Sequence, residues 1–364
     1  MLNVKTRYLA VLSLALLLIA SGCGNNNTAS NTGEVPAGSS APAEKAPAEN
    51  ASKADKLDIK VSFYPMYEFT KNIVGDLAEV ETLIPAGMEP HDWEPTAQDM
   101  AEISAADVLI YNGAGMEGWA QQVIDSASGT QLVAVEASKG LNIMEGAAEE
   151  EEHHADEADH DHEAGGHADE ADHDHEADEH AEEGHDHDHG GLDPHVWLAP
   201  SLAIKEVRTI EAALAAASPE HAAAFQANSD AYIAKLEQLD QEFKNSLKDT
   251  KRKDFITQHA AFGYLAKEYG LTQVPIAGLS PEQEPSAAQM AEIVEFAKAH
   301  DVKTIFFETL VSSSVADTIA REIGAKSAVL NPIEGLTDED RSNHLDYLGI
   351  MRQNLEALKT ALNE

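Results

Sequence analysis

The chain has 364 residues and a formal net charge of −41 at neutral pH, from 24 basic and 65 acidic side chains. This charge excludes a phosphate-contacting nucleic-acid surface and attachment to anionic lipid headgroups by charge. The length is sufficient for two medium-sized domains. About half of the net negative charge lies between Glu149 and His189, which hold 20 acidic residues, 11 histidines and no Lys or Arg.

The first 22 residues are typical of an export signal. Lys5 and Arg7 precede an apolar run, residues 8–20, that is too short to span a bilayer. The run leads to Cys23, the single cysteine of the chain. This ending is similar to a bacterial lipobox, in which the cysteine is lipidated, although the usual pattern prefers Leu at the position of Ala20. An ordinary cleaved signal with an incidental cysteine is the alternative.

Residues 23–56 are rich in small and polar residues, which predicts a flexible tether behind a lipid anchor. Beyond them, alternating apolar residues predict strands, and apolar residues three or four apart predict helices. We expect strands at residues 58–63, 80–84, 108–111 and 132–135, and helices at residues 66–77, 96–106 and 118–127. This alternation indicates an α/β lobe with a mainly parallel sheet.

A long helix is predicted after this lobe and the acidic tract. Ser218-Pro219-Glu220 offers a cap, a proline for the first turn and an early acid. Apolar residues then recur at helical spacing, so we expect a helix over residues 219–247, about 40 Å long. The pattern is too short to favour a coiled coil. Alternation then resumes, with strands at 254–258, 304–307 and 328–330 and helices at 260–269, 287–300, 315–323 and 341–362.

These elements predict an α/β fold in which two lobes with mainly parallel sheets are joined by one long rigid helix. We expect a signal peptide at 1–22, a tether at 23–56, an N-terminal lobe at 57–217 that includes a disordered His/acid-rich loop at 149–190, a linking helix at 218–248 and a C-terminal lobe at 249–364.

Six of the 17 histidines lie outside the acidic tract. His91, His195 and His259 follow predicted strands in loops, and open α/β sheets place ligand sites beyond the carboxyl ends of their strands. A cleft between the lobes could therefore assemble the three histidines as a metal site. Three unrelated structural histidines are the alternative. The remaining three are interpreted as surface residues on helices: His221, His300 and His344.

Five motifs carry a resemblance to a known family. They are Pro90-His91-x-x-Glu94-Pro95, Asp193-Pro194-His195-x-Trp197-Leu198, His259-Ala260-Ala261-Phe262-Gly263-Tyr264, Glu284-Pro285-Ser286 and Tyr347-Leu348-x-x-Met351-Arg352-x-Asn354-Leu355. From Leu57 to the C-terminus, apart from the tract, the chain resembles the metal-specific solute-binding proteins of bacterial ABC transporters, which bind zinc or manganese. The fold of that family, two α/β lobes bridged by a long helix, agrees with the predicted elements.

The resemblance implies a ligand set. His91, His195 and His259 match the family's histidine ligands, and Glu334 best matches a carboxylate ligand near the C-terminus. Glu308 is the alternative ligand, or a residue that holds a ligand in place. Three imidazoles and a carboxylate suit tetrahedral Zn(II), whereas manganese-binding members carry a carboxylate where His259 stands.

The acidic tract offers further imidazoles for metal binding. We expect weak binding, because ordering a flexible chain around each ion costs entropy. The hypothesis is an accessory loop that collects zinc for the main site, and the alternative is a solubilising spacer. The histidines that we assign to this loop are His160, His162, His173, His175, His185, His187 and His189.

The function that follows is high-affinity capture of Zn(II) outside the cytoplasm and its delivery to an ABC transporter permease. We expect a lipid-anchored monomer at the cell membrane and no enzyme activity, because four protein ligands would close the metal site. A zinc hydrolase, a manganese receptor and a metal-dependent surface adhesin are the alternatives. Trp93 and Trp197 each lie two positions after a proposed ligand, so we expect both near the cleft, and packing in the core is an equally weighted alternative.

Overall fold

The structure of the chain is a computed structural model that describes residues 56–146 and 191–364. Cys23, the tether and the histidines of the acidic tract lie outside the described residues. Within the described part, no helix combines the length and the apolar character needed to cross a membrane.

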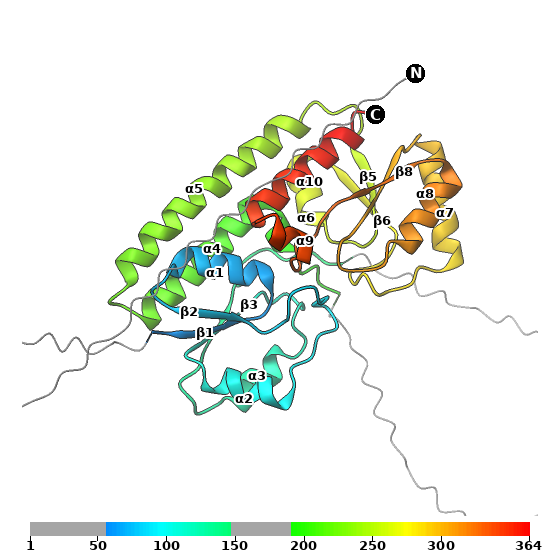
Figure 1. The fold of residues 1–364 in the computed structure, drawn as a ribbon. Helices are drawn as coiled ribbons and strands as arrows, with labels where there is room; N and C mark the ends of the chain where they lie inside the picture. The colour runs from blue at the N-terminus through cyan, green and yellow to red at the C-terminus, as the bar shows by residue number, and fades with distance from the viewer. Residues whose placement is uncertain (1–55, 147–190) are drawn as a thin grey trace, which may run out of the picture. The chain divides into compact units, whose positions relative to one another are not determined.

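The N-terminal lobe is a four-stranded parallel sheet with helices packed against it (Figure 1). Its strand order is β2-β1-β3-β4, and Ile59 of β1 pairs with Val80 on one side and Val108 on the other. Burial of Ile59, Val61 and Phe69 forms its core. The elements are β1 (Asp58–Val61), α1 (Tyr64–Val74), β2 (Glu79–Thr82), α2 (Ala97–Ala105), β3 (Val108–Tyr111), α3 (Ala120–Ser126) and β4 (Val133–Glu136).

The C-terminal lobe has the same topology. Its sheet is parallel with the order β6-β5-β7-β8, so in both lobes the strand order is second, first, third, fourth. The elements are β5 (Asp254–Thr257), α6 (Gly263–Tyr269), β6 (Thr272–Pro275), α7 (Ala287–Ala299), β7 (Thr304–Phe307), α8 (Ser314–Ile323) and β8 (Lys326–Val329).

The long helix α5 (Ala222–Leu247) connects the two lobes. It packs against α1 on the N-terminal side and against α6 and α10 (Tyr347–Ala361) on the C-terminal side, and Figure 1 shows it running alongside α1 and α10. Phe225, Leu236 and Phe243 along its length are fully buried. The predicted α/β class, two parallel-sheet lobes and a long connecting helix, is confirmed.

Several element boundaries differ from the sequence expectation. Helix α4 (Pro200–Ala217) and strand β6 were not predicted, and α4 packs along α5. Ser218–Glu220 form a turn ahead of α5. The predicted helix over 341–362 is two helices, α9 (Asp338–Ser342) and α10, because His344 adopts a left-handed backbone conformation with φ 54° between them.

Candidate metal centre

Four loops, each following a strand, bring the candidate side chains together. His91 lies in the loop after β2, and His195 precedes a 3₁₀ turn between β4 and α4. His259 lies two residues beyond β5, and Glu334 lies in the loop after β8. Loops of both lobes therefore meet at the carboxyl ends of parallel strands, the usual place for ligands in such sheets.

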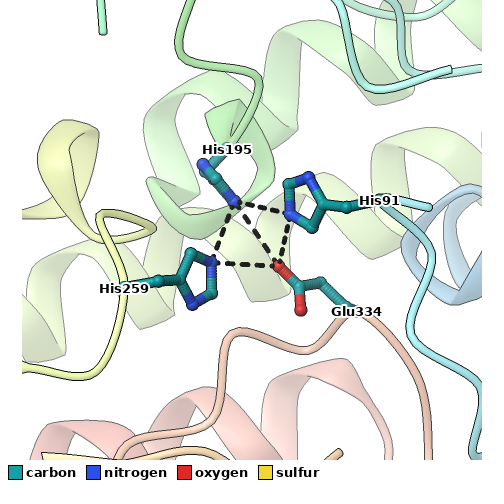
Figure 2. Close-up of side chains that lie close together, drawn as sticks. All are labelled: His91, His195, His259 and Glu334. Atoms are coloured by element: carbon teal, nitrogen blue, oxygen red, sulfur yellow. Dashed lines mark hydrogen bonds and ion pairs between the residues drawn. The ribbon is translucent and has the colours of Figure 1, made fainter. Parts of the chain in front are cut away.

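The four side chains converge on one point (Figure 2). Glu334 Oε1 lies 3.3 Å from His91 Nε2 and 3.4 Å from the Nε2 atoms of both His195 and His259. His195 Nε2 lies 3.3 Å from the Nε2 atoms of His91 and His259. In a tetrahedral zinc site with Zn–N distances of about 2.0–2.1 Å, neighbouring ligand atoms are about 3.3 Å apart. Five of the six separations among the four atoms thus match the edges of such a tetrahedron, and all four atoms lie within 4.8 Å of one another.

The centre is almost closed to solvent. His195 and His259 are fully buried, Glu334 is 3% exposed and His91 is 9% exposed. A carboxylate and three imidazoles in such a place need partners or a cation, because burial of unpaired polar groups costs free energy.

The other ring nitrogens of two histidines face carboxylates. Asp193 Oδ1 lies 2.8 Å from His195 Nδ1, and Glu308 Oε1 lies 2.6 Å from His259 Nδ1. The Glu308 oxygen also accepts a hydrogen bond from the backbone N–H of His259. Such contacts leave Nε2 of each ring free to bind a metal and fix its direction. Sequence reasoning left Glu308 and Glu334 open as the fourth ligand; Glu334 reaches the convergence point, whereas Glu308 lies behind His259.

Asp193 was assigned no role from the sequence, although this residue lies two positions before His195 in one of the five family motifs. An acid two positions before a candidate histidine ligand was the available signal for this role. The Asp193 carboxylate reaches back to its neighbour and also accepts a hydrogen bond from the backbone N–H of His195 at 3.0 Å.

The charges of the metal-free centre are strongly coupled. Burial lowers the pKa of His91 despite the neighbouring Glu334. Burial acts in the same direction on His195, but hydrogen bonds with Asp193 and Glu334 outweigh it and raise the pKa of His195. Burial is likewise outweighed at His259, where Glu308 and Glu334 raise the pKa to about 10.

The carboxylate of Glu334 is the counterpart of these imidazoles. Burial alone would raise its pKa, but the hydrogen bonds and charge of the histidines hold the pKa of Glu334 well below the usual range. The metal-free centre therefore holds protons that a cation must displace.

The two tryptophans occupy different places. The Trp197 ring lies 5.2 Å from the His195 ring, and its Nε1 donates to the Pro332 carbonyl at 2.8 Å. This bond joins the loops that carry His195 and Glu334. Trp93 instead packs against Trp119 in the core of the N-terminal lobe.

The three histidines interpreted as surface residues lie apart from the centre. His300 and His344 are exposed and His221 is half-buried. Cys23 and the tract histidines lie outside the described residues.

Residues 59–361 match the model of the family described as zinc-uptake complex component A, periplasmic, or ZnuA. The chain belongs to the ZnuA family. The high-affinity zinc uptake system protein ZnuA of Bacillus subtilis (strain 168) is 47% identical over 354 residues, which are 97% of each protein. The expected family, the zinc-binding branch of the metal-specific receptors, is confirmed.

Two streptococcal relatives add structural comparisons. The zinc-binding lipoprotein AdcA of Streptococcus pneumoniae is 42% identical over 316 residues, 86% of this chain but 58% of AdcA. A crystal structure of its Zn(II)-bound ZnuA-like domain has 38% identity and a TM-score of 0.67, and covers 85% of this chain and 100% of the domain.

The laminin-binding protein Lmb of Streptococcus agalactiae, described as bifunctional with adhesin and metal-transporting activity, has 33% identity and a TM-score of 0.68 over 85% of this chain and 100% of Lmb.

Proposed function

We propose that this protein captures Zn²⁺ outside the cytoplasm and delivers it to an ABC permease, with His91, His195, His259 and Glu334 as the ligands. The observation that carries the proposal is the set of five separations of 3.3–3.4 Å among the four ligand atoms. Membership of a zinc-uptake family supports the transport role.

The donor set favours zinc over manganese. Three of the four converging atoms are imidazole nitrogens, which suit Zn²⁺, whereas the harder Mn²⁺ prefers oxygen ligands and a larger coordination number. Four protein atoms would also complete a tetrahedral sphere and leave no position for a reactive water. This arrangement supports a carrier of the ion rather than a zinc hydrolase.

The proposal extends to the parts of the chain outside the described residues. Cys23 would carry the lipid that anchors the monomeric protein at the outer face of the membrane, an interpretation supported by the preceding sequence and by the lipoprotein AdcA. The tract histidines would bind further zinc weakly beside the main centre. The alternative of a metal-dependent adhesin is not favoured, although Lmb is described as an adhesin.

A chelator-competition titration of the purified chain with Zn²⁺ and Mn²⁺ tests the ligand set. We expect one tight zinc equivalent, well separated from weaker equivalents on the tract, and far weaker manganese binding. His195→Ala should abolish the tight equivalent, because it removes one of four ligands. The exposed His300 supplies the matched control, since His300→Ala removes an imidazole on a helix end away from the centre.

The control should bind zinc as the unmodified protein does. If the tight equivalent survived in His195→Ala, the proposed centre would be wrong and tight binding would reside elsewhere in the chain.

A further inference from the structure

Two short segments of the N-terminal lobe pair beside the metal centre. Met144–Gly146 and Gly191–Asp193, which we call the stem, form an antiparallel bridge between Glu145 and Leu192. The Asp193 N–H donates to the Met144 carbonyl at 2.9 Å, and the Gly146 N–H donates to the Gly191 carbonyl. Both stem segments therefore depend on each other for backbone hydrogen bonds.

One side chain of the C-terminal lobe bonds to both halves of the stem. The Tyr264 hydroxyl, on α6, accepts the Met144 N–H at 2.8 Å and donates to the Asp193 carbonyl at 2.8 Å. Tyr264 is 4% exposed, so both bonds are formed away from bulk water. Its neighbour Gly263 also lies against Asp193, because a Cβ there would stand 2.9 Å from Asp193 Oδ2.

The stem reaches the metal centre through Asp193. Its backbone carbonyl is held by Tyr264, while its carboxylate accepts from His195 at 2.8 Å through Nδ1. Tyr264 in turn follows His259 by five residues in the C-terminal lobe. A continuous path of chain and hydrogen bonds thus runs from His259 through Tyr264 and Asp193 to His195. The path joins two proposed ligands from different lobes through protein contacts alone.

We infer that Tyr264 is a positioning residue that fixes His195 relative to His259 and thereby sets the geometry of the centre. The inference rests on the proposed zinc-binding function. Ligands that are held before the ion arrives bind it more tightly, and residues that hold a ligand commonly contribute about 10–100-fold to metal affinity. Tyr264 acts through Asp193, so its contribution belongs at the lower end of this range.

Tyr264→Phe in the full chain tests the inference by removing the hydroxyl alone. We expect zinc affinity to fall about tenfold, and the visible absorption of bound Co²⁺, which reports tetrahedral geometry, to weaken and shift. Tyr269→Phe is the matched control, because Tyr269 lies on the same helix and its buried hydroxyl donates to Asp240 at 3.1 Å, away from the centre. This control should lose stability but keep the zinc affinity and the Co²⁺ spectrum.

Gly263→Ala provides a second, independent perturbation. Alanine is favoured over glycine in a helix, yet its Cβ would displace the Asp193 carboxylate, so affinity and the Co²⁺ spectrum should change in a protein that folds. Unchanged affinity and spectrum in both variants would overturn the positioning role, while the loss of tight binding in His195→Ala would still support the ligand set. An unmodified protein without a tight zinc equivalent would refute the proposed function and this inference together.

Discussion

At the scale of single residues, His259 should decide between zinc and manganese. It would supply one of the three nitrogen donors of the proposed centre, and its replacement by Asp changes that donor to oxygen. We expect His259→Asp to lower zinc affinity by at least about 100-fold, more than the loss of a residue that only holds a ligand, and to improve manganese binding relative to zinc. Competition titrations with both ions measure the ratio.

The exposed His300 again provides the control, since His300→Asp makes the same change of charge and size away from the centre. A zinc-to-manganese ratio that stayed the same in His259→Asp and in this control would contradict the assigned role of His259.

Protons should compete with zinc well above the ordinary pKa of histidine. The sequence alone suggests that affinity falls near about pH 6.5. In the folded, metal-free centre the pKa of His259 is about 10, so its imidazole is still protonated at neutral pH, and the pKa of His195 is also raised. Zinc must displace the proton of His259, and its apparent affinity should rise about tenfold per pH unit for each displaced proton between pH 7 and 9.

Calorimetric titrations at pH 8 in two buffers of different protonation enthalpy count the protons released. Release of about one proton or more is expected. Equal binding heats in the two buffers would show that the centre is already deprotonated, and the tight coupling of His259 to Glu308 and Glu334 would then be wrong.

The sequence could identify part of this site, for reasons visible in individual residues. His91, His195 and His259 stood out because they follow strands in loops, which is a local pattern. Glu334 could be chosen only through the family resemblance, since a loop carboxylate carries no distinctive local signal. The link from Tyr264 to Asp193 could not be predicted, because it joins residues 71 positions apart in different lobes.

At the scale of elements, the strength of the local apolar pattern separates the helices and strands that were predicted from those that were missed. Helix α5 was predicted because its apolar residues recur over 26 residues. Strand β6 has four residues, and none of them is fully buried, so its pattern is weak. Helix α4 was missed although Ala203, Val207, Ile210 and Leu214 are buried at helical spacing, because its many alanines and a buried Glu206 blur the contrast between faces.

Glu206 should destabilise the protein. It is fully buried on α4, and neither carboxyl oxygen has a hydrogen-bond partner among the described residues. Burial and the nearby Glu117 raise the pKa of Glu206 well above its usual range. Glu206→Met keeps the length of the side chain and removes the unpaired polar group, so the free energy of unfolding should increase by about 1–3 kcal/mol at pH 7. Urea denaturation measures this change.

The increase in the free energy of unfolding expected for Glu206→Met should depend on pH in a defined direction. An acid with a raised pKa in the folded state destabilises that state above its unfolded pKa, about 4.3 for Glu, so the gain should shrink as the pH approaches this value. Asp240 on α5 is a contrasting buried acid, paired with Lys244 and Tyr269. Asp240→Leu should therefore destabilise, and a loss of stability in both variants would contradict the proposed difference between paired and unpaired acids.

At the scale of the whole molecule, the acidic tract should matter for uptake only when zinc is scarce. In the proposed role its 11 histidines would bind further ions, each weakly, because ordering chain around an ion costs entropy. Replacement of residues 149–190 by a short linker should leave the tight zinc equivalent intact and slow growth at limiting zinc. Equal growth of cells with the intact and shortened proteins would refute the collecting role, and loss of the tight equivalent would place the main site in the tract.

Zinc should stabilise both lobes as one unit. His91 and His195 belong to the N-terminal lobe and His259 and Glu334 to the C-terminal lobe, so the four ligand atoms meet only when both lobes are folded and joined along α5. Free zinc at 1,000 times its dissociation constant should increase the free energy of unfolding by about 4 kcal/mol. Thermal unfolding should then show one transition that moves to higher temperature with zinc in the unmodified protein and in His300→Ala, but much less in His195→Ala. If unfolding showed two transitions and zinc shifted only one of them, a single lobe would hold the ion. The proposed centre between the lobes would then be wrong.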